Sequence, residues 1–314
     1  MTPKVVCVAG PTACGKTTLG VLLAKRFHGE VVSADSMQIY KGLTIGTAAP
    51  TEEEMAGVPH HMIAVADPAE SWSVARYVQE AIPVIDDILS RGKLPILVGG
   101  TGLWMEAVIQ GRGFAAGKAG GEIRKALQRR LESEGSEALL SQLRQVDPQS
   151  AQRLHPSDEK RILRALEVYL ETGRTITVHN EATKSLPPRY GAVWIGLAFQ
   201  NRADMWALIN RRVDRMVQAG LFEEAKSLFR RELPPDATAL QAIGYKEFAG
   251  VLAGTASMEE AVEAVKLHSR QYAKRQLTWL RRNPALHWIF WEKERDFARA
   301  LQLSTEILTS GGVC

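Results

Sequence analysis

The sequence predicts an α/β protein in which a parallel sheet is flanked by helices and is interrupted by an all-helical insertion. Short apolar runs, typical of buried parallel strands, occur at residues 5–9, 30–35, 95–98 and 190–197. Segments with helical apolar spacing lie between these runs, for example residues 73–91 between the second and the third. After a glycine-rich stretch at residues 111–121, the patterns are helical until the strand at residues 190–197. We therefore expect a core of residues 1–112 and 189–314 around a helical domain of residues 113–188.

The first strand leads into a glycine loop, GPTACGKT, at residues 10–17. This loop matches G-x-x-x-x-G-K-[ST], and the strand before it and the helical spacing after it are the context that this motif requires. Glycines allow backbone N–H groups to turn inward, and the helix N-terminus adds positive potential, so the loop is suited to phosphate. Lys16 would neutralise phosphate charge, and the Thr17 hydroxyl would help to hold Mg²⁺. The core is therefore predicted to be P-loop NTPase-like, but the motif does not indicate which phosphate compound the loop binds.

Two further strand ends carry candidate functional residues. Asp35 follows the second strand, and the turn Gly99-Gly100-Thr101-Gly102 follows the third. Because ligands of open α/β sheets gather at the carboxyl ends of strands, we expect Asp35 and the phosphate loop to face one crevice. A helix N-cap and a Mg²⁺ ligand are the alternatives for Asp35. In the loop of residues 44–61, the adjacent His60 and His61 are expected to anchor the chain by hydrogen bonds rather than to bind a metal.

The distribution of charge permits a nucleic-acid partner. The net charge is +4 and the pI about 8.9, which is only mildly basic. On the predicted helix of residues 158–172, Lys160 and Arg164 share a face with Arg161 beside them. Residues 266–282 carry six cations and no acid, interleaved with aromatic side chains. This pattern suits a nucleic-acid backbone, although most charged helical faces are simply solvated.

Composition places the chain among globular proteins of a reducing compartment. It has 314 residues, of which 45% are hydrophobic and 24% charged. Its three cysteines, Cys7, Cys14 and Cys314, form no C-x-x-C pair, which excludes a disulfide framework and a cysteine zinc site. The N-terminal apolar run is too short for a signal peptide, and no stretch approaches membrane-spanning length. We expect a monomeric, cytoplasmic protein that does not associate with membranes.

Several of these stretches together resemble the bacterial tRNA dimethylallyltransferases, also called tRNA isopentenyltransferases. The matching stretches are residues 10–17, 34–40, 58–61, 98–102, 155–156, 160–161, 164–168, 243–247 and 272–279. The phosphate loop alone is widespread, but its combination with Asp-Ser-Met-Gln, Gly-Gly-Thr-Gly and Ala-Lys-Arg-Gln is highly specific. The chain departs from the family at Ala49, where lysine is usual, at Cys14, where serine is common, and in its glycine-rich run at residues 113–121.

The resemblance implies transfer of a dimethylallyl group from dimethylallyl diphosphate to N6 of the adenine 3′-adjacent to the anticodon in tRNA, with Mg²⁺ as cofactor. It implies that Asp35 takes the N6 proton, that Thr101 hydrogen-bonds the bridging oxygen, and that Lys16 stabilises the leaving diphosphate. The implied diphosphate-binding residues are Gly10, Thr12, Ala13, Cys14, Gly15, Lys16, Thr17 and Arg202, and Thr17 is the implied metal ligand. The implied tRNA-binding residues are Asp35, Ser36, Met37, Gln38, Arg124, Lys160, Arg161, Arg164, Gln241, Gly244, Tyr245, Lys246, Lys274, Arg275, Gln276, Trp279 and Arg281. The adenine is expected to flip out of its stack to reach the crevice.

Two other classes of protein remain open from the sequence. A P-loop kinase of a small molecule, or an isopentenyltransferase acting on free adenine nucleotide, would need neither the helical insertion nor the basic helix. A non-catalytic, nucleotide-dependent RNA-binding protein would not need both Asp35 and Thr101 at strand ends.

Overall fold

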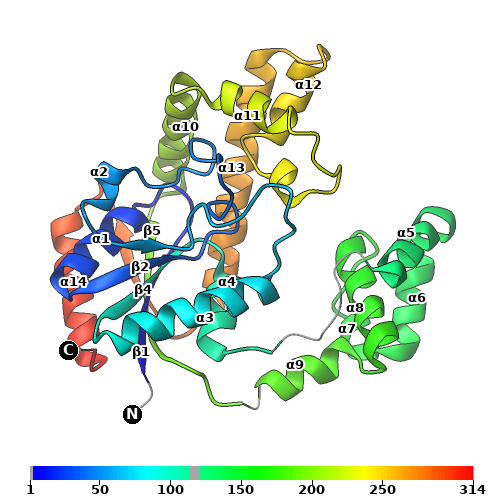
Figure 1. Cartoon of the computed structure of the whole chain (residues 1–314), viewed down its shortest axis with the longest axis horizontal. Coiled ribbons are helices and arrows are strands. Elements are labelled where there is room, and N and C mark those ends of the chain that lie inside the picture. Colours follow the sequence, from blue (N-terminus) through cyan, green and yellow to red (C-terminus); the bar gives the residue numbers. More distant parts are fainter. Residues whose placement is uncertain (1–2, 114–120, 185, 314) are drawn as a thin grey trace. The chain divides into compact units, whose positions relative to one another are not determined.

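The computed structural model describes residues 3–113, 121–184 and 186–313. These residues form two compact units (Figure 1). The first unit comprises Met1–Gly111 and Arg189–Cys314, and the second comprises Arg112–Pro188. Most of the predicted glycine hinge at residues 111–121, and Cys314, lie outside the described residues.

A six-stranded sheet with every neighbouring pair parallel forms the centre of the first unit, which confirms the predicted fold class. The strand order is β3-β2-β4-β1-β5-β6. The strands are β1 (Lys4–Ala9), β2 (Gly29–Ser33), β3 (His60–His61), β4 (Leu94–Gly99), β5 (Gly191–Phe199) and β6 (Leu286–Trp291). Four strands coincide with the predicted apolar runs. The edge strand β3 lies within the segment that was expected to be a loop, and β6 has no counterpart among the predicted elements.

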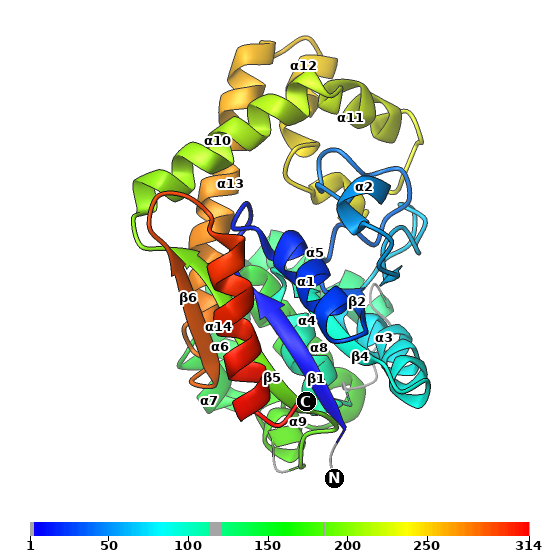
Figure 2. The same ribbon diagram turned by 90° about the vertical axis from the view of Figure 1, so that its left-hand side faces the viewer.

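Helices cover both faces of this sheet, as an all-parallel sheet requires. On one face, α1 (Lys16–Arg26) packs against α14 (Phe297–Ser310), and on the other α3 (Val74–Ser90) packs against α4 (Gly102–Gln110) (Figures 1 and 2). Val6 and Val8 belong to the apolar cluster that includes side chains of α1 and α14, whereas Cys7 between them lies near Tyr77 of α3. The alternation along β1 therefore separates two buried layers.

A third group of helices lies beyond the carboxyl ends of the strands (Figure 2). The segment predicted as a long helix or helix pair is a pair, α10 (Arg202–Gln218) and α11 (Leu221–Phe229), separated at Gly220 with φ +100°. Short helices η1 (Thr238–Gln241), η2 (Lys246–Phe248) and α12 (Ala249–Leu252) lead to α13 (Met258–Leu280). A further short helix, α2 (Glu52–Met55), precedes β3. No helix in the described ranges is sufficiently long and apolar to cross a membrane.

The second unit is entirely helical where it is described. Its helices are α5 (Glu122–Glu134), α6 (Ser136–Val146), α7 (Pro148–Ala151), α8 (Glu159–Thr172) and α9 (Ile176–Lys184). Leu127, Leu140, Leu143, Ile162 and Leu166 are buried in a core of its own. The unit therefore has the internal packing that an inserted domain needs.

A buried carboxylate connects the strands near the amino-terminal end of β2. Glu30 is 2% exposed and accepts hydrogen bonds from Arg91 (2.6 and 2.8 Å), Lys93 (2.5 Å) and His61 Nε2 (2.8 Å). The hydrogen bonds from Arg91, with those from Lys93 and His61, hold the pKa of Glu30 well below its usual range, against the opposing effect of burial. One side chain of β2 thus fixes the residues after α3, the start of β4 and the edge strand β3.

We expect Glu30→Gln to lower the free energy of unfolding at pH 7 by about 2 kcal/mol, because Arg91 and Lys93 lose their shared anion and His61 loses the carboxylate that it contacts. The folded pKa of Glu30 is depressed, so its contribution is complete above the unfolded pKa of about 4.3 and is lost as pH falls below it. Urea unfolding should therefore show a difference between the two proteins that narrows on acidification. Asp87→Asn, which removes an exposed partner of Arg91, is the control and should change stability by less than about 0.5 kcal/mol. An equal difference at pH 7 and pH 3.5 would contradict this assignment.

Candidate active site

The loop of residues 10–17 connects β1 to α1 in a strongly bent conformation. Ala13 has φ 65° and Gly15 has φ 90°, both in the left-handed region. Lys16 Nζ lies over the loop and donates to the Pro11 carbonyl oxygen at 2.7 Å. In the described structure, no side chain caps the N-terminus of α1 and no acid occupies its first turn. Its N–H groups and positive dipole therefore remain suited to an anion.

Side chains from the C-terminal part of the chain hold this loop from outside. Trp291 Nε1 donates to the Cys14 carbonyl oxygen at 2.8 Å. A Cβ atom on Gly15 would lie 2.7 Å from the Phe297 ring, so only glycine fits there. On the other side, the Thr12 backbone N–H donates to Gln276 Oε1 at 2.9 Å. The loop geometry is thus fixed by β6, α14 and α13 together.

Helix α13 also contacts the second glycine turn. Gln276 Nε2 donates to the Gly100 carbonyl oxygen at 3.2 Å, and a Cβ on Gly100 would lie 2.0 Å from this nitrogen. The Trp279 ring packs on Gly102, where a Cβ would lie 2.3 Å away. Gln276 is 5% exposed and its amide is engaged on both loops. A contact between Gln276 and tRNA stays a prediction, whereas its link between the two loops is observed.

The turn after β2 brings Asp35 and Thr101 together. Asp35 Oδ1 accepts the backbone N–H groups of Met37 (2.9 Å) and Gln38 (3.4 Å). Thr101 Oγ1 accepts the N–H of Ser36 at 3.2 Å. Asp35 thus caps a turn with one of its oxygens; it is not the helix N-cap considered as an alternative, because no helix begins at this turn. A carboxylate and a hydroxyl from two neighbouring strands thus flank the same short segment.

Arg212 on α10 is a site residue that the sequence reasoning missed. Its Nη1 donates to Thr12 Oγ1 at 3.2 Å. Burial lowers its pKa, while the nearby Asp35 and Cys14 act in the opposite direction. Arg202, which was assigned to the diphosphate, is exposed and places its guanidinium over the Trp206 ring at 5.7 Å. Its diphosphate role stays a prediction. The sequence signal that could have identified Arg212 is its place directly before Val213, at the edge of the buried stripe of α10.

The residues expected to contact tRNA differ in exposure. Lys274, Arg275, Trp279 and Arg281 are exposed on or beside α13. Lys266, which lies on the same predicted basic stripe, instead pairs with Asp214 at 2.8 Å and Glu263 at 2.9 Å. The stripe is therefore partly neutralised by acids that precede the segment or come from α10.

Other predicted tRNA contacts lie in the 241–247 turn and in the helical unit. Gln241 and Lys246 are exposed, whereas Gly244 and Tyr245 are buried. Within the helical unit, Lys160 is exposed and Arg161 pairs with Asp158 at 3.1 Å. Arg164 and Arg124 lie 2.8 and 3.8 Å from one oxygen of the buried Glu167. Their contacts with tRNA stay predictions.

The histidine pair makes hydrogen bonds at the sheet edge. His60 Nδ1 lies 2.8 Å from the Val58 carbonyl oxygen, and His61 bonds Glu30. The searched part of the chain contains no group of three or more His, Cys, Asp or Glu side chains arranged to hold a metal ion. Any metal at the phosphate loop would depend on Thr17 together with ligand oxygens.

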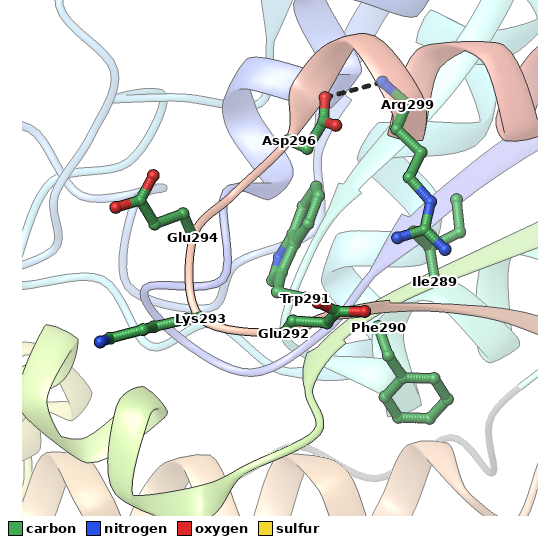
Figure 3. Close-up of a pocket in the computed structure, with 8 residues that line it drawn as sticks. All are labelled: Ile289, Phe290, Trp291, Glu292, Lys293, Glu294, Asp296 and Arg299. Carbon is green, nitrogen blue, oxygen red and sulfur yellow. Dashed lines mark hydrogen bonds between the residues drawn. The ribbon is translucent and has the colours of Figure 1, made fainter.

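A pocket of 320 Å³ lies at the carboxyl end of β6 (Figure 3). Its lining residues are Ile289, Phe290, Trp291, Glu292, Lys293, Glu294, Asp296 and Arg299. Asp296 accepts the Arg299 backbone N–H at 2.9 Å and caps α14. The pocket contains none of the predicted site residues, and Trp291 is its connection to the phosphate loop.

We expect Trp291→Phe to weaken binding of inorganic pyrophosphate by about 5- to 10-fold, because the Cys14 carbonyl loses its buried donor and the loop loosens. Calorimetric titration with pyrophosphate measures this change. Trp288→Phe is the matched control, since Trp288 stacks on Phe290 of the same strand and should leave the affinity unchanged. Equal affinities for both variants and the unmodified protein would mean that Trp291 does not shape the loop.

Comparison with known proteins places this geometry in a family. The family model described as IPP transferase matches residues 38–283, and one described as isopentenyl transferase matches residues 3–66. The tRNA dimethylallyltransferase of Geobacter sulfurreducens is 47% identical over 91% of each chain. That of Caldanaerobacter subterraneus is 45% identical over 92% of each.

Solved structures agree with these sequence matches. The tRNA isopentenylpyrophosphate transferase of Bacillus halodurans superposes with a TM-score of 0.73 at 41% identity, covering 99% of this chain and 98% of its own. A eukaryotic dimethylallyltransferase, captured acting on tRNA, has a TM-score of 0.82 at 29% identity, covering 98% of this chain and 80% of its own. The chain therefore belongs to the IPP transferase family, which includes the tRNA dimethylallyltransferases.

Proposed function

We propose that this protein transfers a dimethylallyl group from dimethylallyl diphosphate to N6 of the adenine 3′-adjacent to the anticodon in tRNA. The observation that carries the proposal is that Asp35 and Thr101 flank Ser36, whose backbone N–H donates to Thr101, beside the phosphate loop. Gln276 bonds both this loop and the turn of Thr101, and Arg212 bonds the loop and lies near Asp35. The membership of the family supports the same reaction. Because its substrate would be tRNA, we expect the enzyme to work in the cytoplasm.

The phosphate loop would receive the diphosphate leaving group. The N–H groups at the start of α1, Lys16 and Arg212 supply positive charge where negative charge develops as the C1–O bond breaks. Mg²⁺ suits the loop, because it prefers phosphate and water oxygens and needs few protein ligands, and Thr17 would be that ligand. When bound, the ion would neutralise diphosphate charge. Thr101 would donate its hydroxyl proton to the bridging oxygen that receives the electron pair.

Asp35 would act as the general base. Its Oδ1 accepts two backbone N–H groups, which fixes the carboxylate and leaves Oδ2 to take the proton from N6. The N6 lone pair attacks C1 of the dimethylallyl group as diphosphate departs, and the proton passes to Asp35. A positioned base contributes about 10²–10⁴ in rate. The adenine has to leave its stack to reach Asp35.

Two surfaces would bind the anticodon arm. One surface is formed by the exposed cations of α13. The same helix contacts the phosphate loop through Gln276 and the turn of residues 99–102 through Gln276 and Trp279. Lys160, Arg161, Arg164 and Arg124 of the helical unit would supply further phosphate contacts. Phosphate contacts of this kind position the RNA without reading its sequence.

The reaction is tested by incubating the protein with dimethylallyl diphosphate, Mg²⁺ and unmodified tRNA and analysing nucleosides by mass spectrometry. We expect N6-(dimethylallyl)adenosine and release of pyrophosphate, with no transfer when ATP replaces the prenyl donor. Asp35→Asn should keep tRNA affinity within a few-fold and lower the single-turnover rate about 100-fold or more.

Asp67→Asn is the control, because Asp67 is an exposed carboxylate paired with Arg231. Its single-turnover rate should equal that of the unmodified protein. ATP hydrolysis or a phosphorylated product without prenylated adenosine would replace the transferase with a kinase. A near-normal rate for Asp35→Asn would remove Asp35 from the role of base.

Binding of tRNA should weaken steeply with salt if the exposed cations contact phosphates. We expect Lys274→Ala with Arg281→Ala to reduce the magnitude of the log–log salt slope by about 1.4 to 1.8, corresponding to two lost contacts. Lys25→Ala with Arg26→Ala removes the same charge from the end of α1 and should leave the slope unchanged except for weak long-range effects. Identical slopes for the two double variants would mean that α13 presents an ordinary solvated surface.

A further inference from the structure

Glu224 on α11 accepts five hydrogen bonds, four of them from a single loop. Its Oε2 accepts the backbone N–H groups of Thr44 and Ile45 and the Thr44 hydroxyl, each at 2.9 Å. Its Oε1 accepts the Gly46 N–H at 2.9 Å and the Tyr245 hydroxyl at 2.6 Å. Three consecutive backbone N–H groups thus converge on one carboxylate, which is the arrangement of an anion-binding nest. Here the anion belongs to the protein itself.

The same contacts give the loop of residues 44–49 a compact shape. Its own hydrogen bonds close it, from Ala48 N to Ile45 O and from Ala49 N to Thr44 O, both at 3.0 Å. Tyr245 packs so closely that a Cβ on Gly46 would lie 2.5 Å from its ring. Tyr245 and the Glu224 carboxylate are therefore among the contacts that define the conformation of this loop.

Gln38 connects this loop to the turn that carries Asp35. Its Nε2 donates to the carbonyl oxygens of Thr47 (3.3 Å) and Ala48 (3.1 Å). Its Oε1 accepts the Ser33 hydroxyl proton at 2.9 Å, and its backbone N–H donates to Asp35 Oδ1. The two carbonyl acceptors are on the loop that Glu224 holds. A displacement of that loop would therefore pull on Gln38 and on the turn that orients Asp35.

The chemistry of the nest requires an ionised carboxylate. Burial acts to raise the pKa of Glu224, but hydrogen bonds from Ile45, Tyr245, Gly46 and Thr44 outweigh it and lower the pKa. Burial and the neighbouring Glu224 raise the pKa of Tyr245, which keeps its phenol protonated as a donor. A glutamine in place of Glu224 would have to direct its amide N–H₂ toward groups that are themselves hydrogen-bond donors.

We propose that Glu224 is a positioning residue that acts through the loop of residues 44–49 and Gln38 to hold Asp35 in the orientation needed to accept the N6 proton. This inference rests on the function proposed above. It assigns to Glu224 no contact with either substrate. Loss of Glu224 should consequently lower kcat while leaving KM for dimethylallyl diphosphate and Kd for tRNA nearly unchanged, because the hydrogen bonds of Glu224 go to residues 44–46 and Tyr245 and not to the phosphate loop or the exposed cations of α13.

The test compares Glu224→Gln with Glu223→Gln. Glu223 precedes Glu224 on the same helix, is exposed and pairs only weakly with Lys226 at 3.6 Å, so it is a matched control. We expect Glu224→Gln to lower kcat about 10-fold, since a misplacement of about 1 Å at a reacting group can cost about 100-fold and a smaller one costs less. KM and tRNA Kd should stay within 3-fold, and Glu223→Gln should behave as the unmodified protein. An unchanged kcat for Glu224→Gln would overturn the inference.

A double-mutant cycle with Gln38→Met tests the route of the effect. If Glu224 acts through Gln38, the double variant should lose little more activity than either single variant, because both disrupt one connection. Multiplicative losses, about 100-fold where each single variant loses 10-fold, would overturn the inference. If Glu224→Gln does not fold, as judged by circular dichroism, Tyr245→Phe replaces it in the cycle and should lower kcat about 3-fold. An unchanged kcat for Tyr245→Phe would then overturn the inference.

The unmodified protein separates the two proposals. If neither the unmodified protein nor Glu223→Gln forms prenylated adenosine, the proposed function fails. The inference about Glu224 fails with it, because there is then no catalysis for Glu224 to support. If both form the product and Glu224→Gln forms it equally fast, only the role of Glu224 fails.

Discussion

The phosphate loop keeps its bent backbone because side chains distant in sequence contact it. A left-handed conformation at Ala13 is unfavourable for a residue with a Cβ, so the surrounding structure has to impose it. Trp291 bonds the Cys14 carbonyl, Phe297 fills the space over Gly15, and Gln276 bonds Thr12 from the opposite side. The bent loop that we propose binds the diphosphate therefore depends on the packing of the C-terminal strand and helices around it.

This dependence gives α13 two functions on two faces. The face that meets the glycine turns carries the buried Gln276, which bonds both turns, and the partly exposed Trp279, whose ring packs on Gly102. Its exposed face carries the cations that we propose bind tRNA. Because the residues on both faces share one helix, the proposed RNA-binding cations have a fixed spacing from the side chains that contact the glycine turns.

The sequence predicted the parts of the fold that repeat a strong local pattern. Four strands are predominantly apolar and largely buried, whereas the edge strand β6 mixes buried and exposed residues and β3 has only two residues. For the site, the motifs predicted Asp35, Thr101 and Lys16, whose roles stay proposals, and they could not indicate where side chains point. Tyr245 and Gln276 are buried, and Arg212 rather than Arg202 contacts the phosphate loop, because helix rotation decides which cation faces inward.

Three acids of the first unit, Glu30, Glu224 and Asp35, differ in how completely hydrogen bonds occupy their oxygens. Both oxygens of Glu30 accept hydrogen bonds from cations, and both oxygens of Glu224 accept hydrogen bonds from backbone and hydroxyl donors. The bonds that hold Asp35 converge on Oδ1. A carboxylate whose two oxygens are saturated is stabilised as an anion and is a poor base, whereas one held by a single oxygen combines fixed orientation with capacity for a proton. This difference in saturation, which no residue type or spacing encodes, is the physical reason to assign structure to Glu30 and Glu224 and chemistry to Asp35.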